Sequence, residues 1–163
     1  MTDKPTSIDA DGVFAPFSAE RAPWQEEFNH GRYGSRWQQL GDFGGGSHLG
    51  VLREELLPGW QSNLLHYHLL EEEHVFILEG MLTLRLGDKS YVMKPGDHVC
   101  FPAGQAVGHC LVNHTDKPCR YLLIGERNPH DVCVYPETGR VGVKLMGEGY
   151  RRAARMAYWE DAP

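Results

Sequence analysis

Between residues 47 and 126 the chain alternates short apolar segments with residues that favour turns. The turns fall at Pro58-Gly59, Gly80, Gly87-Asp88, Pro95-Gly96-Asp97, Pro102-Ala103-Gly104 and Asn113-His114-Thr115-Asp116. They recur about every eight to twelve residues, a spacing typical of all-β proteins. Residues 81–86 alternate apolar and polar side chains, as a half-buried strand does. The pattern predicts an all-β sandwich or barrel, and the 19 glycines and 10 prolines agree with many tight turns.

The chain has 163 residues, which fits one domain, and the strand pattern fades at both ends. We predict an N-terminal arm at residues 1–30, a barrel at residues 31–146 and a C-terminal tail or short helix at residues 147–163. A helix in this tail is predicted because one set of side chains recurs at helical spacing and arginines lie opposite. The apolar face would hold Tyr150, Ala153, Ala154, Ala157 and Tyr158, and the polar face Arg151, Arg152 and Arg155.

The overall charge argues against several classes of partner. The net charge is −6 and the pI about 5.8, which offers no electrostatic basis for binding nucleic acid. No apolar run reaches the roughly 18 residues that a membrane span needs. Residues 1–5 are polar and lack the apolar core of a signal peptide. We therefore expect a cytoplasmic protein that binds a small molecule, with neither nucleic acid nor membrane as partner.

The four cysteines are expected to be free thiols. Cys100, Cys110, Cys119 and Cys133 form no Cys-x-x-Cys pair, so a thiolate zinc site or a thioredoxin-type redox site is not indicated. In a reducing compartment they would stay unpaired and pack as small apolar side chains.

Metal-binding residue types are concentrated in residues 66–80. His66 and His68 are two residues apart, so both imidazoles leave the same face of a strand. Glu71, Glu72 and Glu73 follow and compete for the role of a carboxylate ligand. Two imidazoles and a carboxylate on one face suit a first-row transition metal. For the two histidines alone, polar strand residues without a metal would be the simpler interpretation.

Two motifs follow each other in this part of the chain. The first reads Gly59-x6-His66-x-His68-x4-Glu73-x6-Gly80, and the second reads Gly96-x5-Pro102-x-Gly104-x4-His109-x3-Asn113. Together they resemble the two signature motifs of the cupin superfamily. With Gly125-Glu126-Arg127 and Tyr135-Pro136, the chain is similar to stand-alone single-domain bacterial cupins, a group that includes proposed sugar-phosphate isomerases.

The resemblance implies a double-stranded β-helix, the cupin jelly-roll barrel, with one divalent transition metal inside. By position the ligands would be His66, His68, Glu73 and His109, with Glu72 as the alternative to Glu73. Zn²⁺, Fe²⁺, Mn²⁺, Ni²⁺ and Cu²⁺ all accept such ligands, so the pattern does not select one of them. The resemblance also implies a homodimer, since small cupins commonly pair at a sheet edge.

Two classes of function are compatible with this pattern. One is a metal-dependent enzyme that acts on a small, oxygen-rich molecule, either an isomerase of the sugar-phosphate type or a dioxygenase. Its candidate acid–base groups are Glu72 and His98. The other is a non-catalytic module that binds or senses a small ligand through the metal. A purely structural metal is less expected, because structural zinc sites usually close four ligands, often with cysteine. Candidates to shape the cavity are Phe76, Leu82, Leu84, Phe101 and Leu111, whereas His74 is expected to face outward.

Overall fold

The computed structural model describes residues 6–157 and residue 160. Within them the chain forms thirteen strands, one short α-helix and three 3-10 helices. The strands are β1 (Trp24–Asn29), β2 (Tyr33–Gln39), β3 (Leu49–Leu56), β4 (Tyr67–His68), β5 (Glu73–Glu79), β6 (Leu82–Leu86), β7 (Lys89–Met93), β8 (His98–Phe101), β9 (His109–Val112), β10 (Cys119–Glu126), β11 (Val132–Tyr135), β12 (Arg140–Val143) and β13 (Glu148–Arg151). The helices are η1 (Ala19–Arg21), α1 (Leu40–Phe43), η2 (Lys144–Met146) and η3 (Arg152–Ala154).

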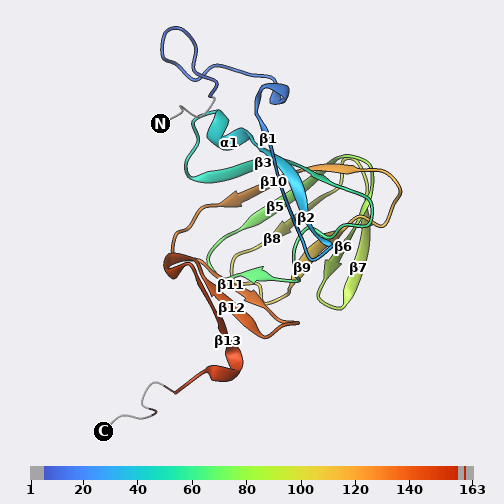
Figure 1. Ribbon diagram of the computed structural model, residues 1–163, viewed down its shortest axis with the longest axis vertical. Coiled ribbons are helices and arrows are strands. Elements are labelled where there is room, and N and C mark those ends of the chain that lie inside the picture. Colours follow the sequence, from blue (N-terminus) through green and yellow to red (C-terminus); the bar gives the residue numbers. More distant parts are fainter. Residues whose placement is uncertain (1–5, 158–159, 161–163) are drawn as a thin grey trace.

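The strands form three sheets. A six-stranded sheet has the order β1-β2-β3-β10-β5-β8, a three-stranded sheet the order β7-β6-β9, and a four-stranded sheet the order β13-β12-β11-β4. All neighbouring strands are antiparallel. Figure 1 shows the N-terminal segment above the six-stranded sheet and β11 to β13 below it. The arrangement confirms the prediction of an all-β jelly roll.

One hydrophobic core lies between the six-stranded and three-stranded sheets. Its buried members are Leu56, Val75, Ile77, Leu82, Leu84, Met93, Phe101, Leu111, Cys119 and Tyr121. On β5 the side chains alternate, so Val75 and Ile77 are buried while Phe76 is exposed. Phe76 is thus wrongly placed among the candidates for the cavity wall, because it shares its face of β5 with outward residues.

The predicted N-terminal arm includes part of the sheet. Strand β1 pairs with β2 in an antiparallel hairpin, with Trp24 opposite Gln38 and Asn29 opposite Tyr33. The turn between them contains His30 and Gly31, both with positive φ. The arm therefore ends in an edge strand of the main sheet, which gives residues 24–29 backbone hydrogen-bond partners.

The helix predicted in the C-terminal tail is wrong for the described residues. Strand β13 pairs with β12, with Val143 opposite Glu148, and only the single turn of η3 follows. Gly147 has a φ of 64°, a left-handed conformation that reverses the chain and lets β13 pair along the free edge of β12. Tyr158 and Trp159 lie outside the described residues. In the part of the chain that the structure describes, no helix is long and apolar enough to cross a membrane.

Candidate metal centre

The backbone brings the four predicted ligands to one place. His66 and His109 face each other across an isolated antiparallel bridge, in which His109 N–H donates to the His66 carbonyl at 2.8 Å. His68 lies in β4, two residues further along the same extended segment, and Glu73 begins β5. Because side chains two residues apart share a face, the imidazoles of His66 and His68 both point to the inside of the barrel.

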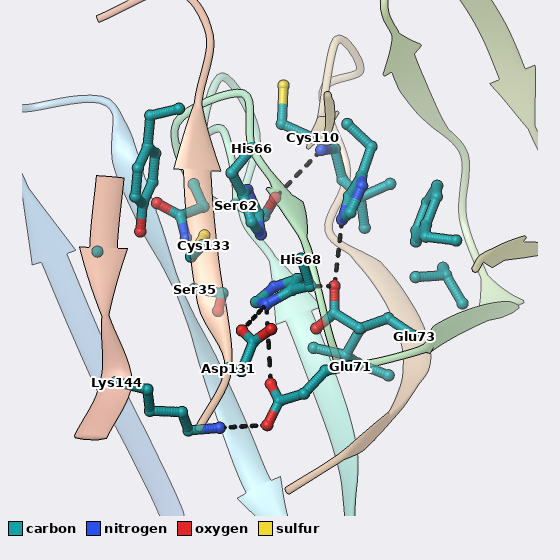
Figure 2. Close-up of a pocket in the computed structure, with 18 of the residues that line it drawn as sticks. Ser35, Ser62, His66, His68, Glu71, Glu73, Cys110, Asp131, Cys133 and Lys144 are labelled. Atoms are coloured by element: carbon teal, nitrogen blue, oxygen red, sulfur yellow. Dashed lines mark hydrogen bonds and ion pairs between the residues drawn. The ribbon is translucent and has the colours of Figure 1, made fainter. Parts of the chain in front are cut away.

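The side chains of these residues converge closely. The Nε2 atom of His109 is 3.1 Å from Glu73 Oε2, and the Nε2 atom of His68 is 3.5 Å from the same oxygen. Ligand atoms of His66, Glu73 and His109 all lie within 4.8 Å of one another. Figure 2 shows the imidazole of His68 between the carboxylates of Glu73 and Asp131.

Hydrogen bonds orient two of the imidazoles toward the centre. The Nδ1 atom of His66 is 2.7 Å from the Leu64 carbonyl oxygen, and Nδ1 of His68 is 2.6 Å from Asp131 Oδ2. Since a carbonyl and a carboxylate only accept, each Nδ1–H donates, which leaves a lone pair on each Nε2. This outer hydrogen bond is the usual support of a metal-ligating histidine. The third ring, that of His109, is held by Phe101, whose ring stacks on it at 3.7 Å.

The electrostatics suit a cation at this point. Burial, together with the neighbouring His109, lowers the pKa of His66 to about 4, so this imidazole is neutral near pH 7. Although burial opposes ionisation of Glu73, its hydrogen bond with His109 and the nearby imidazoles lower its pKa below the ordinary value. Three imidazoles around one carboxylate are a donor set that fits a divalent transition metal. Nδ1 of His109 is buried and has no hydrogen-bond partner among the described residues.

The three adjacent glutamates occupy different environments. Glu73 lies with the imidazoles, while the side chain of Glu72 is 47% exposed and accepts a hydrogen bond from His74. Glu71 is only 5% exposed, where the sequence predicted a solvated acid at the barrel mouth. It accepts the backbone N–H of Asn128 at 2.6 Å and pairs with Lys144, so backbone and lysine partners replace its water. The geometry therefore favours Glu73 over Glu72 as the carboxylate of the site.

The two predicted acid–base candidates lie away from the centre. Glu72 and His98 both contact His74 on the outer side of the sheet, where His98 Nε2 is 3.0 Å from His74 Nδ1. His74 itself faces outward as predicted, because it alternates with Glu73 along β5. Neither candidate can therefore reach a molecule held inside the barrel.

A cavity of about 550 Å³ adjoins the four converging side chains. Glu54 of β3 lines it and is 8% exposed. Tyr121 Oη donates to Glu54 Oε2 at 2.7 Å, and Ser35 Oγ donates to the same oxygen at 3.3 Å. Burial raises the pKa of Glu54 to about 7, against the effect of these hydrogen bonds, and the charge of Glu73 adds to the rise. The sequence analysis did not identify Glu54. Its position two residues before the apolar Leu56 on β3 places both side chains on the same face of the strand, which was the available signal.

Residues beyond the two sequence motifs complete the cavity wall. They include Asp131, Cys133 and Tyr135 from around β11, and Lys144 after β12. Strand β11 pairs with β4, with Cys133 opposite His68, which carries these side chains to the candidate metal centre. The wall is rich in carboxylates, namely those of Glu54, Glu71, Glu73, Asp131 and Glu148. Among the described residues, Lys144 is the only lysine or arginine that lines the cavity.

Comparison with known proteins gives the following matches. Residues 52–125 match the family model described as a cupin domain. No curated protein matches the chain. A solved structure of a sugar phosphate isomerase from a cupin superfamily, from Silicibacter pomeroyi DSS-3, is 29% identical with a TM-score of 0.77, covering 90% of this chain and 99% of that chain. A proposed sugar phosphate isomerase from Acidithiobacillus ferrooxidans ATCC 23270 is 28% identical with a TM-score of 0.79, covering 87% and 95%.

A third structure shows a likeness of fold alone. A predicted oxalate decarboxylase from Thermotoga maritima is 19% identical, with a TM-score of 0.60, and the match covers 70% of this chain and 100% of that chain.

Proposed function

We propose that this protein binds one divalent transition metal in its cavity and is an enzyme that acts on a small, oxygen-rich molecule, in keeping with the match of residues 52–125 to the cupin domain family model. The observation that carries the proposal is the convergence of His66, His68, Glu73 and His109 on one side of an open cavity. The ion would be Zn²⁺, Fe²⁺, Mn²⁺, Ni²⁺ or Cu²⁺. When bound, it would supply a Lewis acid that polarises a substrate oxygen.

Within this proposal Glu54 is the residue that moves a proton. Both hydrogen bonds to its carboxyl group go to Oε2, which leaves Oε1 to accept a proton from a carbon of the substrate and return it to a neighbouring carbon. In the same isomerisation the hydroxyl proton of the substrate passes to the former carbonyl oxygen. A carboxyl group with a pKa of about 7 suits both steps near neutral pH, because its two forms are then both populated. A proton shift of this kind is an isomerisation and needs no oxidant. We therefore favour an isomerase over a dioxygenase.

The charge of the cavity wall points to an uncharged substrate. Its one lysine, Lys144, pairs with Glu71, so no free cation among the described residues meets a phosphate group there. The carboxylates of the wall would repel a phosphate dianion, and a bound divalent ion offsets only two of their charges. Two similar structures are named as sugar phosphate isomerases, one of them provisionally. For this chain we propose an unphosphorylated hydroxy-carbonyl compound instead.

The proposal is tested in two stages. Protein purified without added metal is examined by elemental analysis, beside the His68→Ala and His109→Ala variants. Stoichiometric metal in the parent and the loss of one equivalent from both variants is the expected result. No metal in the parent, even after reconstitution with Fe, Mn, Zn, Ni and Cu, would contradict the metal site. Turnover of hydroxy-carbonyl compounds, with and without phosphate, is then compared between the parent and Glu54→Gln.

The turnover screen also separates an enzyme from a binding module. If metal-loaded protein binds a compound from the panel and returns it unchanged, the protein is a binding or sensor module. If Glu54→Gln keeps its metal and loses turnover, the proton transfer by Glu54 is supported.

A homodimer and a cytoplasmic location also belong to the proposal. In the described part of the chain, β1 and β8 are the edges of the six-stranded sheet, and Phe76 and Leu78 are exposed on β5 beside β8. Exposed strand edges and apolar side chains are commonly covered by a second chain. Size-exclusion chromatography with light scattering at micromolar concentration should give twice the mass of one chain. A mass of one chain would exclude the dimer.

A further inference from the structure

Four side chains form a second cluster on the outer side of the sheet, which we call the outer-face cluster: Glu72, His74, His98 and Cys100. The Nε2 atom of His74 is 2.9 Å from Glu72 Oε1 and 3.9 Å from Cys100 Sγ. These three ligand atoms all lie within 4.8 Å of one another. None of the four residues lines the cavity described above.

Strand pairing holds this cluster in place. His74 of β5 lies directly opposite Cys100 of β8 in the antiparallel ladder. His98 lies two residues before Cys100, so its side chain leaves the same face of β8. Adjacent residues of β5 therefore belong to two different clusters, because Glu73 points to the barrel interior and His74 points to the outer face. The juxtaposition of an imidazole and a thiol is fixed by backbone register and does not depend on a flexible loop.

His98 gives His74 the support that a metal-ligating histidine requires. The two rings stack with centroids 5.2 Å apart and an interplanar angle of 20°, and His98 Nε2 is 3.0 Å from His74 Nδ1. An ion that displaces the Nε2 proton of His74 from its hydrogen bond with Glu72 would bind the Nε2 lone pair, while Nδ1–H of His74 donates to His98. A hydrogen bond to the far ring nitrogen fixes the tautomer of a ligand in this way.

The spacing of the three atoms suits a tetrahedral ion of intermediate softness. Zinc bonds of about 2.0–2.1 Å to nitrogen or oxygen and 2.3 Å to sulfur place neighbouring ligand atoms roughly 3.3–3.6 Å apart. The two measured separations, 2.9 and 3.9 Å, bracket that range. In a single chain the side chains of Glu72 and His74 are 47% and 36% exposed, so an ion can enter from solvent and keep water as its fourth ligand.

We propose that Glu72, His74 and Cys100 form a second metal site, separate from the cavity, that binds Zn²⁺ or a similar divalent ion with His98 as the positioning residue of His74. Nitrogen, oxygen and thiolate ligands together favour zinc, cobalt, nickel or copper over magnesium or calcium. The site joins β5 to the edge strand β8, so a bound ion would stabilise this edge of the sheet. The inference does not depend on the proposed enzyme activity.

Cobalt titration of the full chain tests the site, because a Co²⁺–thiolate bond produces charge-transfer absorption in the near ultraviolet. The parent should show this absorption, and Zn²⁺ should remove it by competition. Cys100→Ser should lack it, while the matched control Cys133→Ser, which alters one of the two thiols that line the cavity, should retain it. His98→Ala should weaken cobalt binding roughly 10–100-fold, as loss of a supporting hydrogen bond to a metal-ligating histidine does.

Three results would overturn the proposal: no thiolate absorption in the parent, its persistence in Cys100→Ser, or its loss in Cys133→Ser alone. Circular dichroism shows whether each variant is folded. His74→Ala removes a second ligand and should also lower the affinity for cobalt. If this variant fails to fold, Glu72→Gln takes its place, and its affinity for cobalt must fall.

Discussion

Asp131 Oδ2 accepts a hydrogen bond from Nδ1 of His68 at 2.6 Å, although 63 residues separate the two in the chain. Oδ1 of the same carboxylate accepts the backbone N–H of Leu70 at 2.9 Å, so both oxygens are used. Burial raises the pKa of Asp131, but these two hydrogen bonds lower it, and the net result is a pKa below the ordinary value. Asp131 is therefore a fixed anion that orients His68 and increases the basicity of its Nε2.

Replacing Asp131 should weaken metal binding without unfolding the protein. Asp131→Asn retains an oxygen that can accept from His68 but removes the negative charge. We expect metal affinity to fall roughly 10–100-fold, as for other outer hydrogen-bond partners of ligating histidines. Competition with a chromogenic chelator measures the affinity. Asp116→Asn removes an exposed carboxylate and should leave it unchanged; equal affinities for Asp131→Asn and the parent would show that Asp131 has no role at the metal.

With the outer-face cluster disabled by Cys100→Ser in every protein compared, metal addition should stabilise the parent and not its ligand variants. A ligand that binds only the folded state at 100 times its Kd adds about 2.7 kcal/mol to the free energy of unfolding. We expect the parent to gain several degrees in Tm, while His66→Ala gains little. His114→Ala, a change at an exposed histidine that bonds to Thr83, is the matched control. Differential scanning calorimetry compares the three, and the same gain in Tm for His66→Ala would argue against it as a ligand.

Glu54 should make the stability of the metal-free protein depend on pH. Its pKa is raised from 4.5 to about 7 in the folded state, so folding favours the protonated form. The contribution of protonated Glu54 to the free energy of unfolding is complete below its pKa in the unfolded chain, and it is lost as the pH rises toward 7. Between pH 4.5 and pH 7.5 the free energy of unfolding of the parent should fall, relative to Glu54→Gln, by on the order of 3 kcal/mol. Urea titrations measure the difference.

A control variant and one contradicting result complete the test by urea titration. The exposed Glu26→Gln should follow the parent across the pH range. Parallel curves for the parent and Glu54→Gln would mean that folding does not raise the pKa of Glu54, which would remove the basis for its role in proton transfer.

Releasing Lys144 from Glu71 should make the cavity more tolerant of phosphate. In Glu71→Gln the lysine loses its carboxylate partner, while the glutamine oxygen can still accept the N–H of Asn128. A free cation about 4 Å from a phosphate is worth about 1 kcal/mol even in water, or about fivefold in affinity. Glu148→Gln removes one negative charge from the same cavity wall and leaves Lys144 paired, so it serves as the control.

Isothermal titration of the metal-loaded proteins with a sugar phosphate measures this effect. Glu71→Gln should bind more tightly than Glu148→Gln. Tight binding of the sugar phosphate by the parent itself would reject the proposal of an uncharged substrate and leave the metal site intact.

Much of the barrel could be predicted from local sequence alone. Turn residues at regular intervals and apolar alternation depend on neighbours in the chain, so they mark strands without knowledge of the fold. The convergence of His66 with His68 follows from strand periodicity. The same periodicity on β5 separates Glu73 from His74, and the structure shows the two facing opposite sides. The prediction of a C-terminal helix was wrong because it rested on the local spacing of alanines and tyrosines. In the structure residues 148–151 instead form backbone hydrogen bonds with the free edge of β12, a contact that local spacing does not reveal.

The sequence by itself determined the all-β class and which four side chains meet beside the cavity. Only the tertiary structure decided what surrounds them, because β11 reaches β4 across more than sixty residues and brings Asp131 to His68. It also decided the roles of the glutamates, since the burial of Glu54 and Glu71 and their partners, Tyr121 and Lys144, come from distant parts of the chain. A residue's identity is local information, whereas its solvent exposure and its charged neighbours are set by contacts between distant strands.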